Sequence, residues 1–263
     1  LWQYGFDANS KEKSSGAFLK MHFFKTLVAF FLYIFIAVPS FSATLGAVEG
    51  EETHRFDVFL LGIKAGELRY HKSVKGTAYS AQTVLETTGL VALLAPYMFQ
   101  AEVTGQRLKN RYLPQNYVET SNTGKRITNK TMRYKNQRPT LLAAGERKKY
   151  WLKPADQKGT LDPLSALLAL LDDAVSSQLC NADLPVFDGE RRVSLSLSGP
   201  TKLPEDGLTC QGIYTRLGGF SKQELADGVT FPFYINYHPI DAGYRVTKFS
   251  FSTLRGTATF ERR

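Results

Sequence analysis

Apolar and polar residues alternate with a period of two through most of this chain after residue 54, and turn signals recur about every ten residues. Phe56 to Leu60 and Glu67 to His71 alternate on either side of Gly62 and Gly66, which predicts a tight hairpin. Further alternating segments lie at residues 77–87, 98–108, 115–121, 125–134, 193–197, 210–217, 229–237, 244–254 and 257–263. We therefore predict an all-β, mainly antiparallel fold, a barrel or a sandwich, in one domain over residues 44–263.

A single segment shows helical periodicity instead. Leu164, Leu167, Leu168 and Leu171 share one face at 3.6-residue spacing within residues 164–175. Asp162 can cap this helix and Pro163 fits its first turn. We expect the helix to pack at one end of the barrel or in its concave face. Nearby, Pro114 is expected to separate two strands, and residues 148–152 to form a short basic strand.

Residues 21–43 have the parts of a secretory signal peptide in order. A short basic start at residues 21–25 precedes an apolar core of 12 residues (27–38), and small residues at Ser40 and Ser42 suit cleavage. The core is shorter than the roughly 20 residues that span a bilayer, so we expect export and no anchor after cleavage. An uncleaved anchor is the alternative. Residues 1–20 are predicted to be a disordered extension or a mis-assigned start, with translation beginning at Met21.

The two cysteines of the chain, Cys180 and Cys210, are predicted to form one structural disulfide. An isolated pair in an exported protein favours a disulfide, and neither a neighbouring histidine nor a Cys-x-x-Cys arrangement suggests a reactive thiol.

No catalytic or metal-binding pattern is visible. His54, His71 and His238 lack metal-ligand spacing, and there is no Gly-x-Ser-x-Gly elbow and no nucleotide-binding glycine loop. The acidic pairs at residues 51–52, 172–173 and 205–206 fall at expected loop or helix ends, where we interpret them as solvated charges. We therefore expect a non-enzymatic protein without metal or cofactor.

Two features suggest a binding surface. The first is the apolar run at residues 88–99, which predicts either a lid or wall for a greasy ligand or a short core helix. With the 164–171 helix, it supplies the candidate ligand-binding residues Leu90, Leu93, Leu94, Tyr97, Phe99, Leu164 and Leu168.

The second feature is a basic stripe over residues 125–149, of which Lys125, Arg126, Lys148 and Lys149 are candidate contacts to an anionic surface. The net charge of +9 agrees with an anionic partner, although solubility alone would also explain it. In an exported protein we expect phospholipid, lipopolysaccharide or cell-wall polymer rather than nucleic acid.

Several landmarks occur in an order that resembles the bacterial exported family called domain of unknown function 3108, over about residues 54–260. They are residues 59–68 (FLLGIKAGEL), 87–90 (TTGL), 113–117 (LPQNY), 162–167 (DPLSAL), 186–192 (VFDGERR), 210–214 (CQGIY) and 218–220 (GGF). The resemblance implies a periplasmic protein of Gram-negative bacteria with a curved, incompletely closed barrel similar to lipoprotein carriers. It supplies no catalytic residues.

Together these observations predict a periplasmic, non-enzymatic cell-envelope protein that binds a lipid or another amphipathic envelope component in the concave face of a half-barrel. The alternative is a module that binds another envelope protein through exposed strand edges. The sequence does not indicate an oligomeric state.

Overall fold

The computed structural model describes residues 50–143, 147–253 and 256–263. The predicted signal peptide and the extension before it lie outside these residues. The described chain forms one 13-stranded antiparallel sheet in the order β7-β6-β5-β4-β3-β2-β1-β13-β12-β11-β10-β9-β8. Its strands are β1 (Gly50–Leu60), β2 (Ile63–Lys75), β3 (Ala78–Thr87), β4 (Met98–Leu108), β5 (Arg111–Asn122), β6 (Ile127–Lys135), β7 (Arg138–Ala143), β8 (Ala182–Phe187), β9 (Arg192–Lys202), β10 (Leu208–Gly218), β11 (Thr230–Ile240), β12 (Gly243–Thr253) and β13 (Gly256–Arg262).

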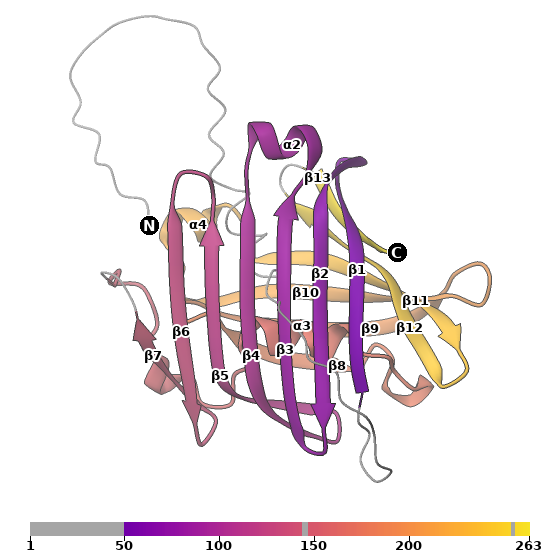
Figure 1. Cartoon of the computed structure of the whole chain (residues 1–263), viewed down its shortest axis with the longest axis horizontal. Coiled ribbons are helices and arrows are strands. Elements are labelled where there is room, and N and C mark those ends of the chain that lie inside the picture. The colour runs from indigo at the N-terminus through magenta and orange to yellow at the C-terminus, as the bar shows by residue number, and fades with distance from the viewer. Residues whose placement is uncertain (1–49, 144–146, 254–255) are drawn as a thin grey trace, which may run out of the picture.

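The sheet is curved and open, as predicted. Strands β1–β6 stand upright at the front of Figure 1, and the strands of the second half cross behind them. β1 pairs with β13, which joins the first and last strands in the middle of the sheet. The edge strands β7 and β8 form no ladder with each other in the described part of the chain. The all-β, half-barrel prediction is therefore confirmed.

The connection between the two edges carries the main helix. It contains η1 (Pro154–Asp156), α3 (Pro163–Leu171) and η2 (Ser176–Gln178), while α2 (Gly89–Leu94) and α4 (Lys222–Ala226) lie in other connections. Helix α3 packs against β4 and β5 of one half and β8 of the other. Eight of its nine residues are buried, and six of them, the five leucines and Ala166, belong to a hydrophobic cluster shared by both halves of the sheet. The concave face is thus occupied by the chain's own helix.

Local sequence explains both ends of α3. At its start, the Asp162 side chain accepts hydrogen bonds from the backbone N–H groups of Leu164 and Ser165, and Pro163 occupies the first turn, as predicted. The helix ends at Leu171, four residues before the predicted end, where two aspartates follow.

Two strand predictions need correction. β5 runs through Pro114 instead of ending there, because Pro114 lies opposite Gly105 at a register shift in the β4–β5 ladder, where strands tolerate proline. Residues 148–152 form a turn and not a strand, since Leu152 N donates to Glu190 O across the β8–β9 turn.

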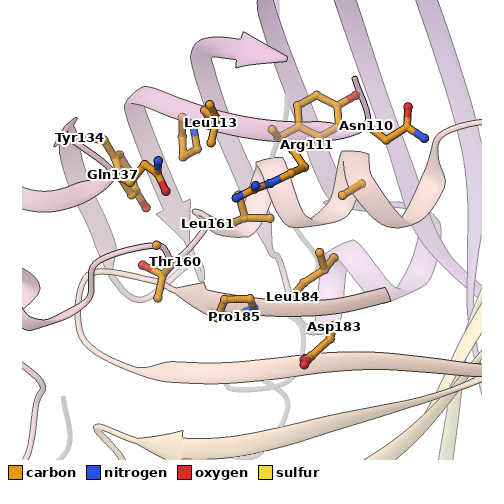
Figure 2. Close-up of a pocket in the computed structure, with 14 residues that line it drawn as sticks. Asn110, Arg111, Leu113, Tyr134, Gln137, Thr160, Leu161, Asp183, Leu184 and Pro185 are labelled. Atoms are coloured by element: carbon orange, nitrogen blue, oxygen red, sulfur yellow. The ribbon is translucent and has the colours of Figure 1, made fainter. Parts of the chain in front are cut away.

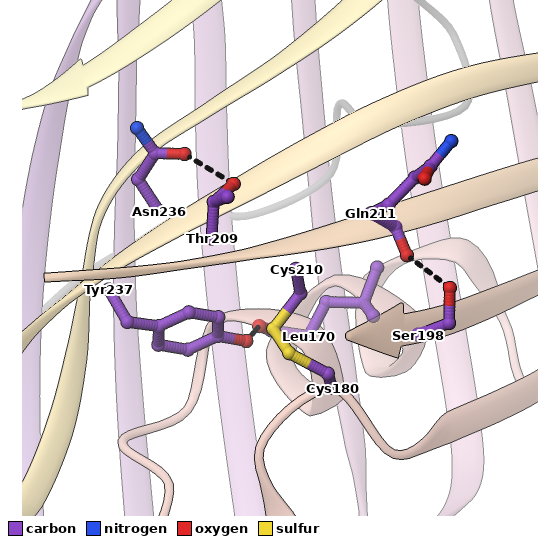
Figure 3. The surroundings of a disulfide bond; sticks show 8 residues. All are labelled: Leu170, Cys180, Ser198, Thr209, Cys210, Gln211, Asn236 and Tyr237. Carbon is purple, nitrogen blue, oxygen red and sulfur yellow. Dashed lines mark hydrogen bonds between the residues drawn. A yellow bond between two sulfur atoms is a disulfide. The ribbon is translucent and has the colours of Figure 1, made fainter. Parts of the chain in front are cut away.

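The predicted disulfide is present. Cys180 and Cys210 are bonded, with Cα atoms 5.2 Å apart, and both are buried. Figure 3 shows the bond beside Tyr237, whose hydroxyl donates to the Leu170 carbonyl oxygen of α3 at 3.4 Å. The bond therefore ties the chain that enters β8 to β10, next to the end of α3.

Candidate functional site: an exposed apolar rim

The β3–β4 connection presents a short helix, α2, whose base is fixed by backbone geometry. Thr87 N donates to Tyr97 O at 2.9 Å, and Tyr97 N donates to the Thr87 hydroxyl at 2.9 Å. Gly89 adopts a positive φ of 58° to start the helix, and Pro96 follows its end. All six residues of α2 are described, and none is buried. The helix therefore projects from the end of the sheet on a fixed base (Figure 1).

Three leucines dominate the surface of α2. Leu90, Leu93 and Leu94 are 78%, 80% and 82% exposed. Single exposed apolar residues are common on soluble proteins, but a group of adjacent ones marks a site of interaction.

Neighbouring turns add more exposed apolar side chains. Leu61 and Ile63 in the β1–β2 hairpin are 65% and 68% exposed, and Ile127 after the β5–β6 turn is 62% exposed. We call Leu61, Ile63, Leu90, Leu93, Leu94 and Ile127 the apolar rim. Leu61, Ile63 and Ile127 were not predicted as site residues. The apolar residues around the hairpin glycine were a signal for two of them, because turns are normally polar.

The apolar rim lies beside a basic turn. Lys125 and Arg126 are exposed in the β5–β6 connection, and a Cβ built on Gly124 would lie 2.6 Å from Cγ of Pro96 at the end of α2. The structure thus brings Lys125 and Arg126 close to the leucines of α2. Lys148 and Lys149 lie in a different segment, beside the β8–β9 turn, where the Lys148 amine lies over the Tyr150 ring.

The predicted ligand-binding residues do not form one surface. Tyr97, Phe99, Leu164 and Leu168 are buried in the hydrophobic cluster, whereas the three leucines of α2 face outward. The apolar run divides at Pro96, because Tyr97 and Phe99 after it point into the core, Phe99 as part of the alternation of β4. Helix α2 is therefore not a core helix, and it does not cover the concave face as a lid.

The described residues also line a cavity of about 230 Å³ near the β4–β5 and β6–β7 turns. Figure 2 shows polar Asn110, Arg111, Gln137, Thr160 and Asp183 around it together with apolar Leu113, Leu161, Leu184 and Pro185. The volume is below the roughly 300 Å³ at the lower end of typical small-molecule pockets. The mixed lining and small size do not suit an acyl chain.

Buried charges join α3 to the first half of the sheet. The Asp172 carboxylate accepts hydrogen bonds from Lys72 Nζ at 2.7 Å, Arg107 Nη2 at 3.1 Å and the Tyr112 hydroxyl at 2.7 Å. The interpretation of this acidic pair as solvated is therefore wrong for Asp172. Asp173 is partly exposed and pairs with Arg245 of β12.

The other two acidic pairs also differ from each other in burial: Glu52 is partly buried, whereas Glu205 and Asp206 are exposed to solvent. Glu52 is half-buried, and a hydrogen bond from His54, with Lys72 close by, lowers its pKa to about 2. Glu205 and Asp206 are exposed, as expected for solvated charges.

A second buried cluster crosses between the halves. Lys130 Nζ donates to the Asp188 carbonyl oxygen at 3.0 Å and lies 3.6 Å from the carboxylates of Glu119 and Glu190. Burial raises the pKa of Glu119 to about 8, and the Tyr117 hydroxyl donates to it at 2.9 Å. Lys130 therefore faces inward, whereas Arg133 and Lys135 of the same basic stripe are exposed on the other face of β6. Lys130 offsets the charge of the two carboxylates and links β6 to the β8–β9 turn, so we interpret the cluster as structural.

Metal-binding clusters and membrane-spanning helices are both absent from the described residues. No group of three or more histidine, cysteine, aspartate or glutamate side chains is placed to hold a metal ion. Within the same residues, no helix combines the length and apolarity needed to cross a membrane.

Comparison with known proteins identifies the family. Residues 55–210 match the family described as "Protein of unknown function (DUF3108)". The chain belongs to this family. The resemblance inferred from the sequence landmarks is thereby confirmed, whereas the periplasmic location that it implied remains a prediction.

Other comparisons add little to this assignment. No curated protein matched the chain. Among solved structures, the chain is similar to a "Beta-barrel-like Protein of Domain of Unknown Function DUF1849 from Brucella abortus", with 10% identity, a TM-score of 0.45, and coverage of 83% of this chain and 97% of that chain.

Proposed function

We propose that this DUF3108 protein is a non-enzymatic, periplasmic cell-envelope protein that binds an amphipathic envelope component on its surface, through the apolar rim. The observation that carries the proposal is the roughly 80% exposure of three adjacent leucines on a helix with a fixed base. The signal-peptide pattern of residues 21–43 supports the proposed location.

Burial of the rim in an apolar phase would release enough free energy for reversible binding. Fully burying one leucine side chain contributes about 1.5–3 kcal/mol, so the three leucines of α2 would contribute several kcal/mol even when only partly inserted. Micromolar affinity requires about 8 kcal/mol. The remaining rim residues and the basic turn would supply the rest.

This proposal changes the predicted mode of binding and keeps the predicted ligand class. A container for lipid needs an empty apolar interior, but α3 and the side chains around it occupy the concave face. A surface site needs only exposed apolar side chains beside a polar fringe, which the rim and the basic turn provide.

Binding through strand edges receives less support. The edge strands β7 and β8 contain Pro139 and Pro185, which cannot donate to a ladder. The outer edge of β8 is also partly occupied, because Leu161 N donates to Pro185 O and Phe187 N donates to Leu161 O, both at 2.8 Å.

The test compares two triple variants of the exported protein, purified without the predicted signal peptide, so that the apolar core of that peptide does not itself bind vesicles. Leu90→Ser, Leu93→Ser and Leu94→Ser are combined in one variant. Leu108→Ser, Val118→Ser and Leu217→Ser, three exposed apolar residues outside the rim, are combined in the other. In co-sedimentation with vesicles of phosphatidylethanolamine and phosphatidylglycerol, we expect the first variant to bind at least 30-fold more weakly than the original protein. The second should bind within twofold of it; equal binding by the original protein and both variants would overturn the proposal.

A further inference from the structure

The apolar rim is built from three turns at one end of the sheet. In an antiparallel meander alternate connections lie at the same end, here the β1–β2 turn, the β3–β4 connection with α2, and the β5–β6 turn. Backbone contacts fix two of these turns: Thr88 N donates to Ala65 O at 3.0 Å, which holds the β3–β4 connection against the start of β2, and Leu61 N donates to Thr257 O at 3.1 Å, which holds the β1–β2 turn against β13. With the contact between Gly124 and Pro96, these bonds hold the apolar side chains at one end of the upright strands.

The charge around the rim is positive. The connecting residues 61–62, 88–97 and 123–126 contain no acidic residue. Three carboxylates on the strands that lead to these turns are paired: Asp57 with Lys64, Glu67 with Arg263 and Glu86 with Arg69. Lys125 and Arg126 are exposed, and in the part of the chain that the structure describes neither has an ion-pair partner. The two cations beside the leucines are therefore available to an external anion.

We propose that the partner of the rim is the surface of a phospholipid bilayer with anionic headgroups. The leucines of α2 insert into the boundary between headgroups and acyl chains, and Lys125 and Arg126 contact lipid phosphates. In this orientation the strands β1–β6 extend from the bilayer surface into the surrounding water. This inference rests on the proposed function, because it names the amphipathic component that the rim binds.

The dimensions of α2 fit shallow insertion. Helix α2 has six residues and exposes its leucines on one side, and apolar faces of peripheral helices enter a bilayer by about 5–10 Å. Apolar side chains flanked by lysine and arginine are the usual composition of such elements. A purely apolar protein partner would explain the leucines but not the two unpaired cations beside them.

The orientation can be measured with one fluorescent label. Both cysteines of the chain are in the disulfide, so a cysteine introduced at Leu93→Cys or Thr77→Cys is the only free thiol. Thr77 is exposed in the β2–β3 turn, at the opposite end of the same strands. A nitrobenzoxadiazole label on each variant of the exported protein, without the predicted signal peptide, is titrated with vesicles of phosphatidylcholine, alone or with 30% phosphatidylglycerol. The emission of the label at residue 93 should shift to shorter wavelength and be quenched by nitroxide lipids. The emission of the label at residue 77 should not change, because that label stays in water.

A charge variant tests the headgroup preference. Lys125→Gln with Arg126→Gln should weaken binding to anionic vesicles about 25-fold, since each basic residue near an anionic surface contributes about fivefold. Lys109→Gln with Lys135→Gln removes the same charge at the opposite end and should change binding less than threefold.

Three outcomes separate the two proposals. Insertion at residue 93 that is equally strong in neutral and anionic vesicles would overturn the anionic bilayer and leave the proposed function standing. A label at residue 93 that stays in water with every vesicle would overturn both. Insertion at residue 77 in place of residue 93 would overturn the proposed orientation.

Discussion

Asp162 illustrates how a single buried carboxyl can make the stability of the fold depend on pH. It caps α3, and its oxygens accept hydrogen bonds from Leu164 N, Ser165 N and the Ser165 hydroxyl at 2.5–3.0 Å. Burial raises its pKa to about 6, compared with about 3.9 in an unfolded chain. Because the folded pKa is the higher one, the contribution of Asp162 to stability is complete below about pH 4 and is lost as the pH rises through 6.

Asp162→Asn should remove this dependence and keep the cap, because asparagine also accepts the backbone hydrogen bonds. Relative to the original protein, the free energy of unfolding of the variant should rise by about 2–3 kcal/mol between pH 4 and pH 7. Urea denaturation at pH 4, 5, 6 and 7 measures the difference. Asp162→Ala, which also lacks the carboxyl but loses the cap, should be less stable than Asp162→Asn at every pH. Parallel profiles for the original protein and Asp162→Asn would contradict the prediction.

Two consecutive aspartates at the end of α3 offer a matched comparison of buried and exposed ion pairs. Asp172→Ala removes three hydrogen bonds and deprives the buried Lys72 amine of its shortest partner, so it should cost about 3–5 kcal/mol. Asp173→Ala breaks a partly exposed pair with Arg245 and should cost at most about 1 kcal/mol. Chemical denaturation of both variants measures the two losses. Similar losses for the two variants would show that Asp172 does not fasten α3 to the sheet.

At the scale of elements, α2 and α3 are both leucine-rich and behave in opposite ways. Leu168 of α3 is buried, and Leu168→Ala should lower the free energy of unfolding by about 2.7–5 kcal/mol. Leu93 of α2 is exposed, and Leu93→Ala should leave stability within about 0.5 kcal/mol. The effects on vesicle binding should be the opposite. Leu93→Ala should weaken binding, and Leu168→Ala should leave it unchanged at temperatures where the variant is folded. If Leu168→Ala weakened binding without loss of stability, α3 would be part of the site after all.

The sequence could predict α3 because its signals are local. A capping aspartate, a proline in the first turn and leucines at helical spacing all lie within ten residues. The strand of residues 98–108 and the β1–β2 hairpin were predictable for the same reason, since alternation and glycine turns are local patterns.

The position of α2 could not be predicted in this way. An apolar run has the same composition in a core and at an exposed tip, and only the pairing of β3 with β4 places it at the end of the sheet. The burial and ion pairing of Asp172 could not be predicted from the sequence either, because its partner Lys72 is 100 residues away along the chain. Contacts of that kind depend on strand register across the whole sheet, which one sequence does not reveal.

At the scale of the whole molecule, the two edges of the open sheet are secured differently. β8 is held by Leu161 along its outer edge and follows Cys180, whose disulfide to Cys210 closes a loop that contains β8 and β9. β7 is a six-residue strand with a proline, and no disulfide lies near it. We expect amide hydrogen exchange to be faster in β7 than in β8, and slowest in the central strands β1–β3.

Removal of the disulfide should abolish the difference in amide hydrogen exchange between the edge strands β7 and β8. A cross-link over a sequence separation of 30 residues stabilises a fold by about 3–4 kcal/mol on the chain-entropy model. Cys180→Ser with Cys210→Ser should therefore lower the urea midpoint and raise exchange in β8 and β9 to the level of β7, with a smaller change in β1–β3. The vesicle affinity of the folded variant should stay the same, because the apolar rim lies on the β1–β6 half of the sheet, outside the cross-linked loop. Loss of vesicle binding in this variant would mean that the rim depends on the second half of the sheet, and that the molecule does not separate a stabilised half from a binding half.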